Sequence, residues 1–352
     1  MRLLVLLLGL LLFGGSSFAC TTFFINKNGQ MVFGRNYDWL TDAGSVYTNS
    51  RGLAKTSLST GNGTTISWVS QYGSITFNQY GKEFPTGGMN EKGLVVELMW
   101  LDGTTYPSAD SRAAIGVLQW IQYQLDNCST VKEVIATDKK LRISSVGNTP
   151  LHYLVADANG QVASIEFLDG KMVVHTGKEL SMPVLTNTTY SESIDYYRQS
   201  RQPGNPQNGN NSLERFGKAC SMIRELQSGR KEVAPVDYAF TILGAVAQGS
   251  FTKWSIVYDI SNRSIQFTTH RFQQRKTVRF TSFDFTCNKT SKAWDMNQVA
   301  TGDISARFGN FTASHNKKLI ETAFKESRSR LDVDDKTIAT LVGYPSEITC
   351  KQ

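Results

Sequence analysis

The chain of 352 residues has little that would support metal or cofactor chemistry. Its four histidines, His152, His175, His270 and His315, lack the spacing of a metal site, and no two cysteines form a Cys-x-x-Cys pair. Neither a Walker loop nor the glycine fingerprint of dinucleotide binding is present. We therefore expect an activity that needs no metal and no cofactor.

Long hydrophobic runs are also missing after the first 19 residues, so we expect no stable membrane span. With 40% hydrophobic and 19% charged residues, the composition is that of a globular chain with a substantial core. The formal net charge is +7, but lysine and arginine are scattered without a dense run. This favours a solvated basic surface over nucleic-acid binding, and a positive field would favour anionic substrates.

The N-terminus is the exception to this lack of apolar runs. Residues 1–19 hold one arginine, a leucine-rich segment too short to span a bilayer, and the small residues Ser17 and Ala19. These are the features of a secretory signal peptide. We predict cleavage between Ala19 and Cys20, a periplasmic or secreted location, and one domain over residues 20–352.

Cleavage there would make a cysteine, Cys20, the first mature residue. The other four cysteines can make two disulfide pairs and leave this one over: Cys128, Cys220, Cys287 and Cys350. An α-amine has a pKa of about 7.7 to 8.0 and a thiol of about 8.5, so an N-terminal cysteine can use its own amine as base. Lipidation of Cys20, or a disulfide to it, remains an alternative.

The residues after this cysteine predict a hairpin. Two β-prone runs, at 21–26 and 30–34, flank an Asn-Gly turn at 28–29. Arg35 and Asp38 follow the second run, so the hairpin would return both of them to the N-terminal thiol. A cation lowers the pKa of a thiol, and a carboxylate can hold an ammonium or guanidinium group. A surface ion pair is the alternative.

Three motifs carry a more specific resemblance. They are CTTFF at 20–24, FGRNYDW at 33–39 and GGMNEKGL at 87–94. They resemble the choloylglycine hydrolase and penicillin V acylase family over nearly the whole mature chain. The resemblance implies an N-terminal cysteine amidase with an α+β fold, an αββα sandwich of two antiparallel sheets between helical layers. This is the N-terminal nucleophile hydrolase fold.

Periodicity along the chain is consistent with that architecture. We expect a turn at 87–93, with strands at 94–101, 151–156, 162–168, 171–175, 253–260, 264–270 and 277–285. Helices are expected at 111–127, 130–139, 236–248 and within 310–328. Hairpins before and after paired helices predict two stacked antiparallel sheets between helical layers.

Two further polar residues are candidates for the active site. Asn187 ends the run MPVLTN, and a neutral amide is a suitable donor to an oxyanion. Arg215 lies in the first turn of a helix that Ser212 would cap, where a cation is unfavourable without a specific partner. The resemblance assigns Asn187 to the oxyanion site and Arg215 to the surroundings of the nucleophile. A turn cap and a solvated helix arginine are the respective alternatives.

Aromatic residues are candidates for substrate binding. Trp39, Trp68 and Tyr72 lie in segments that line the pocket in the resembled family. Trp100 ends the strand after the glycine-rich turn, where that family usually has Asn or Tyr. An indole cannot replace an amide donor, but its flat apolar face favours aromatic or aliphatic acyl groups. Packing in the core is the alternative for all four.

Together these features predict an exported amidase with Cys20, Arg35, Asp38, Asn187 and Arg215 as its catalytic residues. Its expected substrate is a small N-acyl amide such as penicillin V or an acyl-homoserine lactone. A bile-salt hydrolase and an acyltransferase with the same nucleophile are alternatives. A non-catalytic exported β-rich binding protein is another. The resemblance also implies a homotetramer by analogy.

Overall fold

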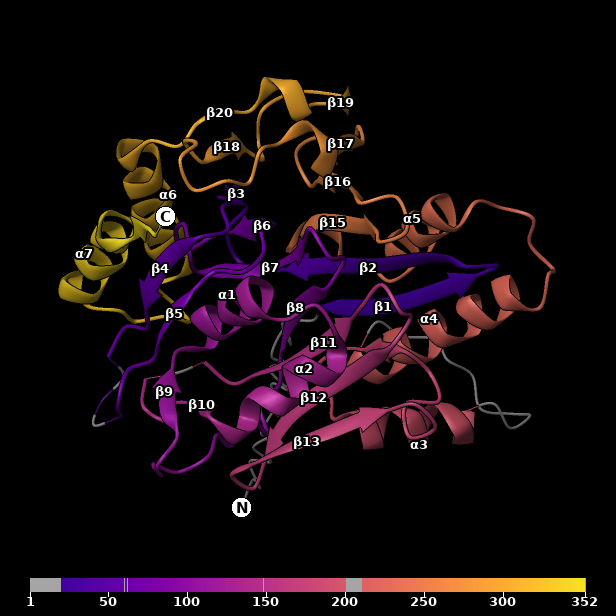
Figure 1. The fold of residues 1–352 in the computed structure, drawn as a ribbon. Coiled ribbons are helices and arrows are strands. Elements are labelled where there is room, and N and C mark those ends of the chain that lie inside the picture. Colours follow the sequence, from indigo (N-terminus) through magenta and orange to yellow (C-terminus); the bar gives the residue numbers. More distant parts are fainter. Residues whose placement is uncertain (1–19, 60, 62, 148, 201–210, 352) are drawn as a thin grey trace, which may run out of the picture.

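The computed structural model describes residues 20–59, 61, 63–147, 149–200 and 211–351. The predicted signal peptide, residues 1–19, lies outside the described residues. Two β-sheets stack between helical layers (Figure 1). Helix α1, Val117–Asn127, packs on one sheet, and α4, Ser212–Gln227, packs with α5, Pro235–Ala245, on the other. This is the αββα arrangement that the resemblance implied, and the fold prediction is confirmed.

The first sheet carries the N-terminal hairpin near one edge, where of the described strands only the short β14 lies outside it. Within the described ranges it has seven strands, in the order β14-β1-β2-β15-β16-β17-β19. Their bounds are Val184–Leu185, Thr21–Lys27, Gln30–Asp38, Thr252–Asp259, Ser264–Thr269, Lys276–Arg279 and Gly302–Asp303. All neighbours are antiparallel except β17 and β19.

The second sheet is built from the middle of the chain. Nine strands are described in it, in the order β13-β12-β11-β8-β7-β6-β3-β18-β20. Their bounds are Lys171–Thr176, Val162–Leu168, Leu151–Ala156, Val95–Trp100, Pro85–Asn90, Ser74–Asn78, Ser45–Asn49, Lys292–Asp295 and Gly309–Asn310. Each neighbouring pair is antiparallel.

The remaining elements lie around the two large sheets. The small sheets consist of β9, Ala113–Ile115, with β10, Leu141–Ile143, and of β21, Thr349–Cys350, with β4, Leu53–Thr56, and β5, Ser67–Val69. The other α-helices are α2, Val131–Ala136, α3, Tyr190–Ser200, α6, Ala313–Ser327, and α7, Asp335–Gly343. Short 3-10 turns occur at Thr137–Lys139, Gly249–Phe251, Phe280–Ser282, Ser305–Arg307 and Tyr344–Glu347.

The main core lies between the two large sheets. Phe77 of β6 meets two rings of the other sheet edge to face, Tyr258 at 6.0 Å and Phe267 at 5.5 Å between centroids. All three side chains are fully buried. Edge-to-face packing adds about 0.5 to 1.5 kcal/mol per pair to the burial itself. The sheets are therefore held in register by specific ring contacts, which also fixes the strands that carry the site.

The N-terminal hairpin forms as the sequence predicts. Asn28 and Gly29 adopt φ of 53° and 83°, the left-handed conformations that a two-residue turn requires. The register pairs Lys27 with Gln30 and continues to Thr21 with Asn36. Strand β2 is longer than expected, because it also pairs with β15 as far as Asp38. Arg35 and Asp38 consequently lie within the strand and not beyond it.

Several other boundaries differ from the sequence-based prediction. Residues 87–90 belong to strand β7, and only residues 91–93 turn, because β7 pairs on both sides in a buried sheet. The first helix begins at Val117, since residues 113–115 form β9. Asn211, and not Ser212, caps α4, with a capping box to Glu214.

Four cysteines could form two disulfides, but the described residues contain one. Cys287 and Cys350 are bonded, and this bond joins the C-terminal strand to the segment before β18. Cys128 and Cys220 are both buried and free, on different helices or helix ends. Cys20 is also a free thiol, so the disulfide alternative for it is not found in the structure.

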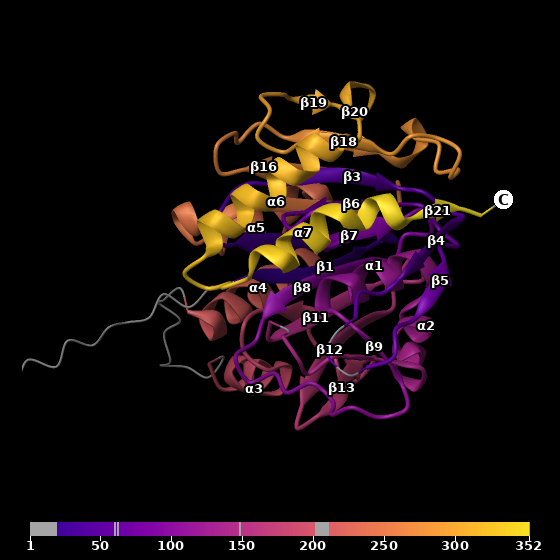
Figure 2. The same ribbon diagram turned by 90° about the vertical axis from the view of Figure 1, so that its left-hand side faces the viewer.

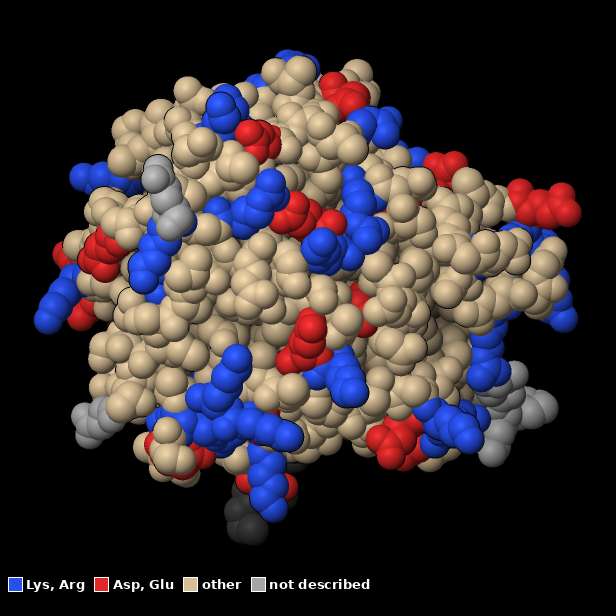
Figure 3. Space-filling model, in the orientation of Figure 1, with Lys and Arg blue, Asp and Glu red and all other residues tan. Residues whose placement is uncertain are grey.

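Lysine and arginine are interspersed with acidic side chains over the face seen in Figure 3. None of the helices in the described part of the chain is both long and apolar enough to cross a membrane.

Candidate active site

Cys20 lies at the start of β1, where the hairpin register brings the end of β2 beside it. Its side chain is only 4% exposed, and Sγ lies 3.9 Å from the backbone oxygen of Asp38, to which the thiol donates. It forms part of the lining of a pocket of about 530 Å³. The thiol is thus buried against the strands but reaches the inside of a ligand-sized cavity.

Arg35 is fully buried between the two sheets. One guanidinium nitrogen donates to the backbone oxygen of Thr86 at 3.1 Å and to the carboxylate of Glu97. The other terminal nitrogen donates to the backbone oxygen of Leu98 at 3.1 Å, and the group lies 4.6 Å from the Tyr37 ring centre. Its charge is therefore held by the opposite sheet, and from there it opposes the rise in the pKa of Cys20 that burial causes.

The partner of Arg35, Glu97, was not selected by the sequence reasoning. It accepts hydrogen bonds from Arg35 and from the hydroxyl of Tyr258, and burial raises its pKa to about 7, against the effect of Arg35. A Cβ at Gly87 would collide with this carboxylate, which explains the glycine in that strand. The signal was a lone carboxylate in the apolar strand LVVELMWL, because a buried charge needs a partner.

Asp38 is 1% exposed and bonded on one oxygen only. Its Oδ1 accepts a hydrogen bond from Thr252 at 2.5 Å, whereas no described group donates to its buried Oδ2. Burial raises the pKa of Asp38 to about 7, and the Thr252 bond and both nearby arginines oppose that rise. A buried carboxylate oxygen without a donor is costly, so this atom is a natural acceptor for an added cation.

Arg215 connects Cys20 to Asn187. Its guanidinium donates to the backbone oxygen of Cys20 at 3.0 Å, to the Thr21 hydroxyl at 2.9 Å and to Oδ1 of Asn187 at 3.2 Å. These contacts provide the specific partners expected of an arginine in the first turn of a helix. The capping box at Asn211 fixes the start of α4 and so the point from which Arg215 reaches inward.

Asn187 is oriented by groups on three sides. Its Nδ2 donates to the backbone oxygen of Trp100 at 2.8 Å, and its backbone N–H donates to the Ser212 hydroxyl at 2.9 Å. The preceding carbonyl, of Thr186, accepts from His152 at 2.7 Å. An amide nitrogen has two hydrogens, so one remains after the bond to Trp100.

The electrostatics of the thiol combine opposing effects. Burial raises the pKa of Cys20, while the guanidinium groups of Arg35 and Arg215 lower it and the carboxylate of Asp38 raises it. Of the five residues selected from the sequence, Arg215 contacts Cys20 and Asn187, and the thiol donates to Asp38. Arg35 acts on the thiol through its charge and contacts Glu97 instead.

A comparison of the sequence with known protein families gives a match. The family model of the linear amide C–N hydrolases, choloylglycine hydrolase family, matches residues 20–224, more than half of the chain and beginning at Cys20. The chain belongs to this family.

Individual relatives agree with the assignment. The chain is similar to penicillin V acylase from Pectobacterium atrosepticum, at 27% identity over 57% of this chain and 64% of that protein, so the match spans less than two thirds of the relative. It is also similar to the structure of penicillin V acylase from Agrobacterium tumefaciens, at 25% identity. That match has a TM-score of 0.73 and covers 83% of this chain and 98% of the other.

A more distant structure shares the fold. A variant of conjugated bile acid hydrolase from Clostridium perfringens matches with a TM-score of 0.67 at 18% identity, over 80% of this chain and 98% of that one.

Two of the four aromatic candidates line the pocket in this choloylglycine hydrolase family member. Trp39 and Trp100 do so with ring centres 5.9 Å apart. The indole N–H of Trp100 donates to Asp102 at 2.6 Å, so it is not aimed at an oxyanion. Trp39 donates to the Tyr80 hydroxyl at 2.6 Å, and the backbone oxygen of Trp100 accepts from Asn187.

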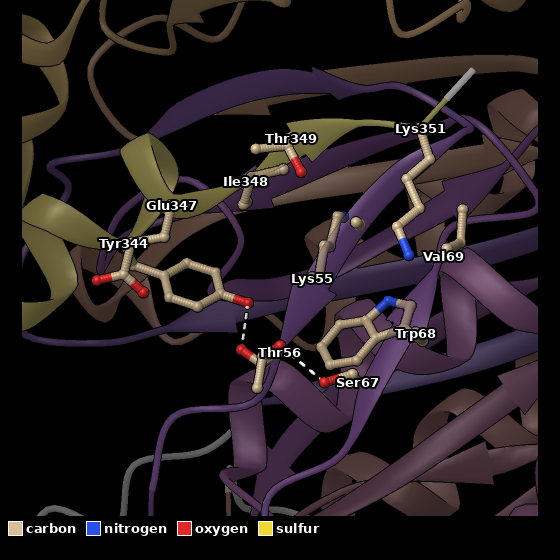
Figure 4. Close-up of a pocket in the computed structure, with 11 residues that line it drawn as sticks. Lys55, Thr56, Ser67, Trp68, Val69, Tyr344, Glu347, Ile348, Thr349 and Lys351 are labelled. Carbon is tan, nitrogen blue, oxygen red and sulfur yellow. Dashed lines mark hydrogen bonds between the residues drawn. The ribbon is translucent and has the colours of Figure 1, made fainter.

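The other two candidates lie elsewhere. Trp68 lines a separate pocket between β4, β5 and the C-terminus, where Tyr344 and Lys351 also lie (Figure 4). Its indole donates to Asp126 at 2.8 Å, a bond that a core tryptophan needs. Tyr72 lies beneath the Lys92 ammonium, 5.7 Å from the ring centre. The structure therefore does not place Trp68 or Tyr72 at the Cys20 pocket.

No group of three or more His, Cys, Asp or Glu in the described ranges could hold a metal ion.

Proposed function

We propose that this family member is an exported amidase that hydrolyses N-acyl amides with Cys20 as an N-terminal nucleophile. The observation that carries the proposal is the placement of the Cys20 thiol in a ligand-sized pocket, between two buried arginines and a carboxylate with one unpartnered oxygen. Removal of residues 1–19 would create an α-amine at Cys20. Its ammonium form is the cation that Oδ2 of Asp38 can accept.

The first half of the reaction forms a thioester. The α-amine takes the thiol proton, and Sγ of Cys20 attacks the carbonyl carbon of the amide. The oxyanion that develops accepts from the second N–H of Asn187 and from a backbone N–H near residue 100. The resulting ammonium gives its proton to the leaving nitrogen, the C–N bond breaks, and a thioester and a free amine remain.

The second half of the reaction releases the acid. The same amine takes a proton from water, the hydroxide attacks the thioester, and the thiol leaves with that proton restored. Arg35 and Arg215 stabilise the thiolate form, because each lowers the pKa of Cys20. Asp38 holds the ammonium in place. No step requires a metal or a cofactor.

The pocket lining supports a substrate with an apolar acyl group, such as penicillin V or an acyl-homoserine lactone. Trp39 and Trp100 face the same cavity as Cys20, and Leu98 and Leu151 line it as well. Such walls bury apolar surface but offer few partners to a polar conjugate.

The test is hydrolysis by the chain beginning at Cys20, measured on penicillin V, an acyl-homoserine lactone and glycocholate. Two variants are compared with it, Cys20→Ser and a form with one residue added before Cys20. We expect activity on at least one of the first two substrates and its loss in both variants. An extended form as active as the parent would exclude the α-amine as the base. Cleavage of glycocholate alone would identify a bile-salt hydrolase instead.

A further inference from the structure

The wall of the Cys20 pocket opposite the strands comes from the far end of the chain. Seven residues of α6, of α7 and of the segment between them line the pocket that holds the thiol: Phe324, Arg330, Leu331, Asp332, Val333, Thr337 and Leu341. Figure 2 shows α6 and α7 side by side across one face of the molecule, in contact with each other. The two helices and their connection, residues 313–343, are called here the C-terminal hairpin.

This hairpin lies outside the stretch that defines the family. The family model matches residues 20–224, and the hairpin begins about 90 residues later along the chain. The pocket is consequently composite. Cys20 and the residues that contact it or Arg35, namely Glu97, Asn187 and Arg215, lie within the matched range, whereas the hairpin part of the lining lies beyond it.

The hairpin is fixed at both ends. At the end of α6, the buried hydroxyl of Ser327 lies 3.0 Å from the indole nitrogen of Trp39 and 3.1 Å from the hydroxyl of Tyr80. Beyond α7, the Tyr344 hydroxyl donates to the backbone oxygen of Thr56 at 2.8 Å (Figure 4). The Cys287–Cys350 disulfide holds the C-terminal strand.

Most of this wall is apolar, and the charged side chains of Arg330 and Asp332, which also line the pocket, are exposed. Leu331, Val333 and Leu341 are all half-buried and face the same cavity. Leu58 and Leu118 line the same cavity, and Leu118 packs against the same hydrophobic cluster as the three hairpin side chains. Together these branched aliphatic side chains form a slot that can bury methylene groups, which need no hydrogen-bond partners.

We propose that the C-terminal hairpin is the specificity-determining wall of the pocket and selects amides with a long linear aliphatic acyl chain. This inference rests on the proposed function, because it places the acyl group in the pocket that Cys20 shares. Each methylene that the slot buries should raise kcat/KM by roughly fourfold until the slot is filled.

The test uses a series of N-acyl amides with one leaving amine and hexanoyl, decanoyl or dodecanoyl chains. Thr337→Trp adds a large side chain to the slot from an exposed position, where the fold tolerates it. We expect kcat/KM for the dodecanoyl amide to fall at least about tenfold, and that for the hexanoyl amide to change less than about twofold. Leu341→Ala should lower the dodecanoyl rate several-fold by removing contacts.

The matched control is Thr340→Trp, the same substitution on the same helix at an exposed threonine that does not line this pocket. We expect its chain-length profile to equal that of the parent. An equal loss for all chain lengths in Thr337→Trp, or an unchanged profile, would overturn the inference.

A binding measurement separates this inference from the proposed function. If the parent chain cleaves none of the amides, the proposed function fails. Calorimetric binding of the dodecanoyl amide to the Cys20→Ala chain, with and without Thr337→Trp, then decides the role of the hairpin. Binding that Thr337→Trp weakens at least about tenfold supports the hairpin, and no binding, or binding it leaves unchanged, overturns it.

Discussion

The two walls of the pocket are built in opposite ways. Directly behind the lining on the strand side, Arg35, Glu97 and Arg215 are at most 1% exposed, and each is held by two or more hydrogen bonds. On the other side, α7 has no buried residue at all within its bounds, Asp335–Gly343. One wall is supported by buried, charged and hydrogen-bonded groups, and the other is mainly apolar and partly open to solvent.

This difference assigns the chemical reaction to one wall and the choice of acyl group to the other. Groups that stabilise developing charge must be oriented before the substrate arrives, which requires burial and complete hydrogen bonding. A wall that only removes methylene groups from water needs neither. Changes on the strand side should therefore alter stability and kcat, whereas changes on the hairpin side should alter the preference among acyl groups.

The largest expected effect follows from removing the carboxylate that pairs with Arg35. Glu97→Ala leaves a buried guanidinium without its charged partner and the Tyr258 hydroxyl without its acceptor. We expect the free energy of unfolding to fall by about 3 to 5 kcal/mol, measured by denaturant unfolding. Leu341→Ala on the hairpin should lower it far less. Similar losses for the two variants would contradict the contrast between the walls.

The charge at Asp38 gives a prediction that depends on pH. Its pKa of about 7 lies above the ordinary value of 3.8, so the folded form holds a proton more tightly than the unfolded chain does. Between about pH 4 and pH 7 the unfolded chain ionises first, and this group makes the fold less stable as the pH rises. Asp38→Asn removes that dependence.

Two forms of the chain test this sign. In a form that retains a residue before Cys20, the stability of Asp38→Asn relative to its parent should rise by up to about 4 kcal/mol from pH 4 to pH 7. In the form that begins at Cys20, an ammonium beside Asp38 would lower its pKa and reduce the rise. Equal pH dependence in both forms would show that the α-amine does not contact Asp38.

The next effect is on catalysis alone. Asn187→Ala removes the proposed oxyanion donor, and we expect kcat to fall about 10²-fold to 10³-fold. KM for a given acyl chain should change little, because the acyl wall is untouched. Steady-state kinetics on the hexanoyl and dodecanoyl amides measure both quantities. A loss that differs between the two chain lengths would indicate that Asn187 contacts the acyl group.

The sequence predicted the strand side better than the hairpin side, and the reason is physical. Asn28 and Gly29 specify a turn by local conformation, and the turn fixes the register that brings Asp38 to Cys20. Glu97 was visible as a lone charge in an apolar run, but its partner could not be named without the packing of two sheets. Contacts between sheets depend on many residues far apart in sequence.

The same distinction between local patterns and distant contacts applies to the prediction of the fold. Apolar runs identified β11 and β12, because burial on both faces leaves a strong apolar signal. Strand β13 is less buried and was identified by the Asp-Gly turn before it. Helices α3 and α7 were not predicted. Helix α7 has no buried residue, and its half-buried Ile338, Leu341 and Val342, although at helical spacing, were not recognised as a helix face. Trp68 looked like a ligand contact but bonds to Asp126, a partner that only the fold reveals.

The smallest expected effect concerns Ser327, whose hydroxyl connects the hairpin to the strand side of the pocket. Ser327→Ala removes a buried hydroxyl that contacts Trp39 and Tyr80, and should lower the free energy of unfolding by about 1 kcal/mol. Because the bond between Trp39 and Tyr80 remains, kcat on the hexanoyl amide should hold, while the preference for the dodecanoyl amide weakens. Ser314→Ala, on an exposed part of the same helix, is the control. If Ser327→Ala lowers the rates on both amides equally, the Ser327 hydroxyl orients Trp39 for catalysis, and the two walls do not act separately.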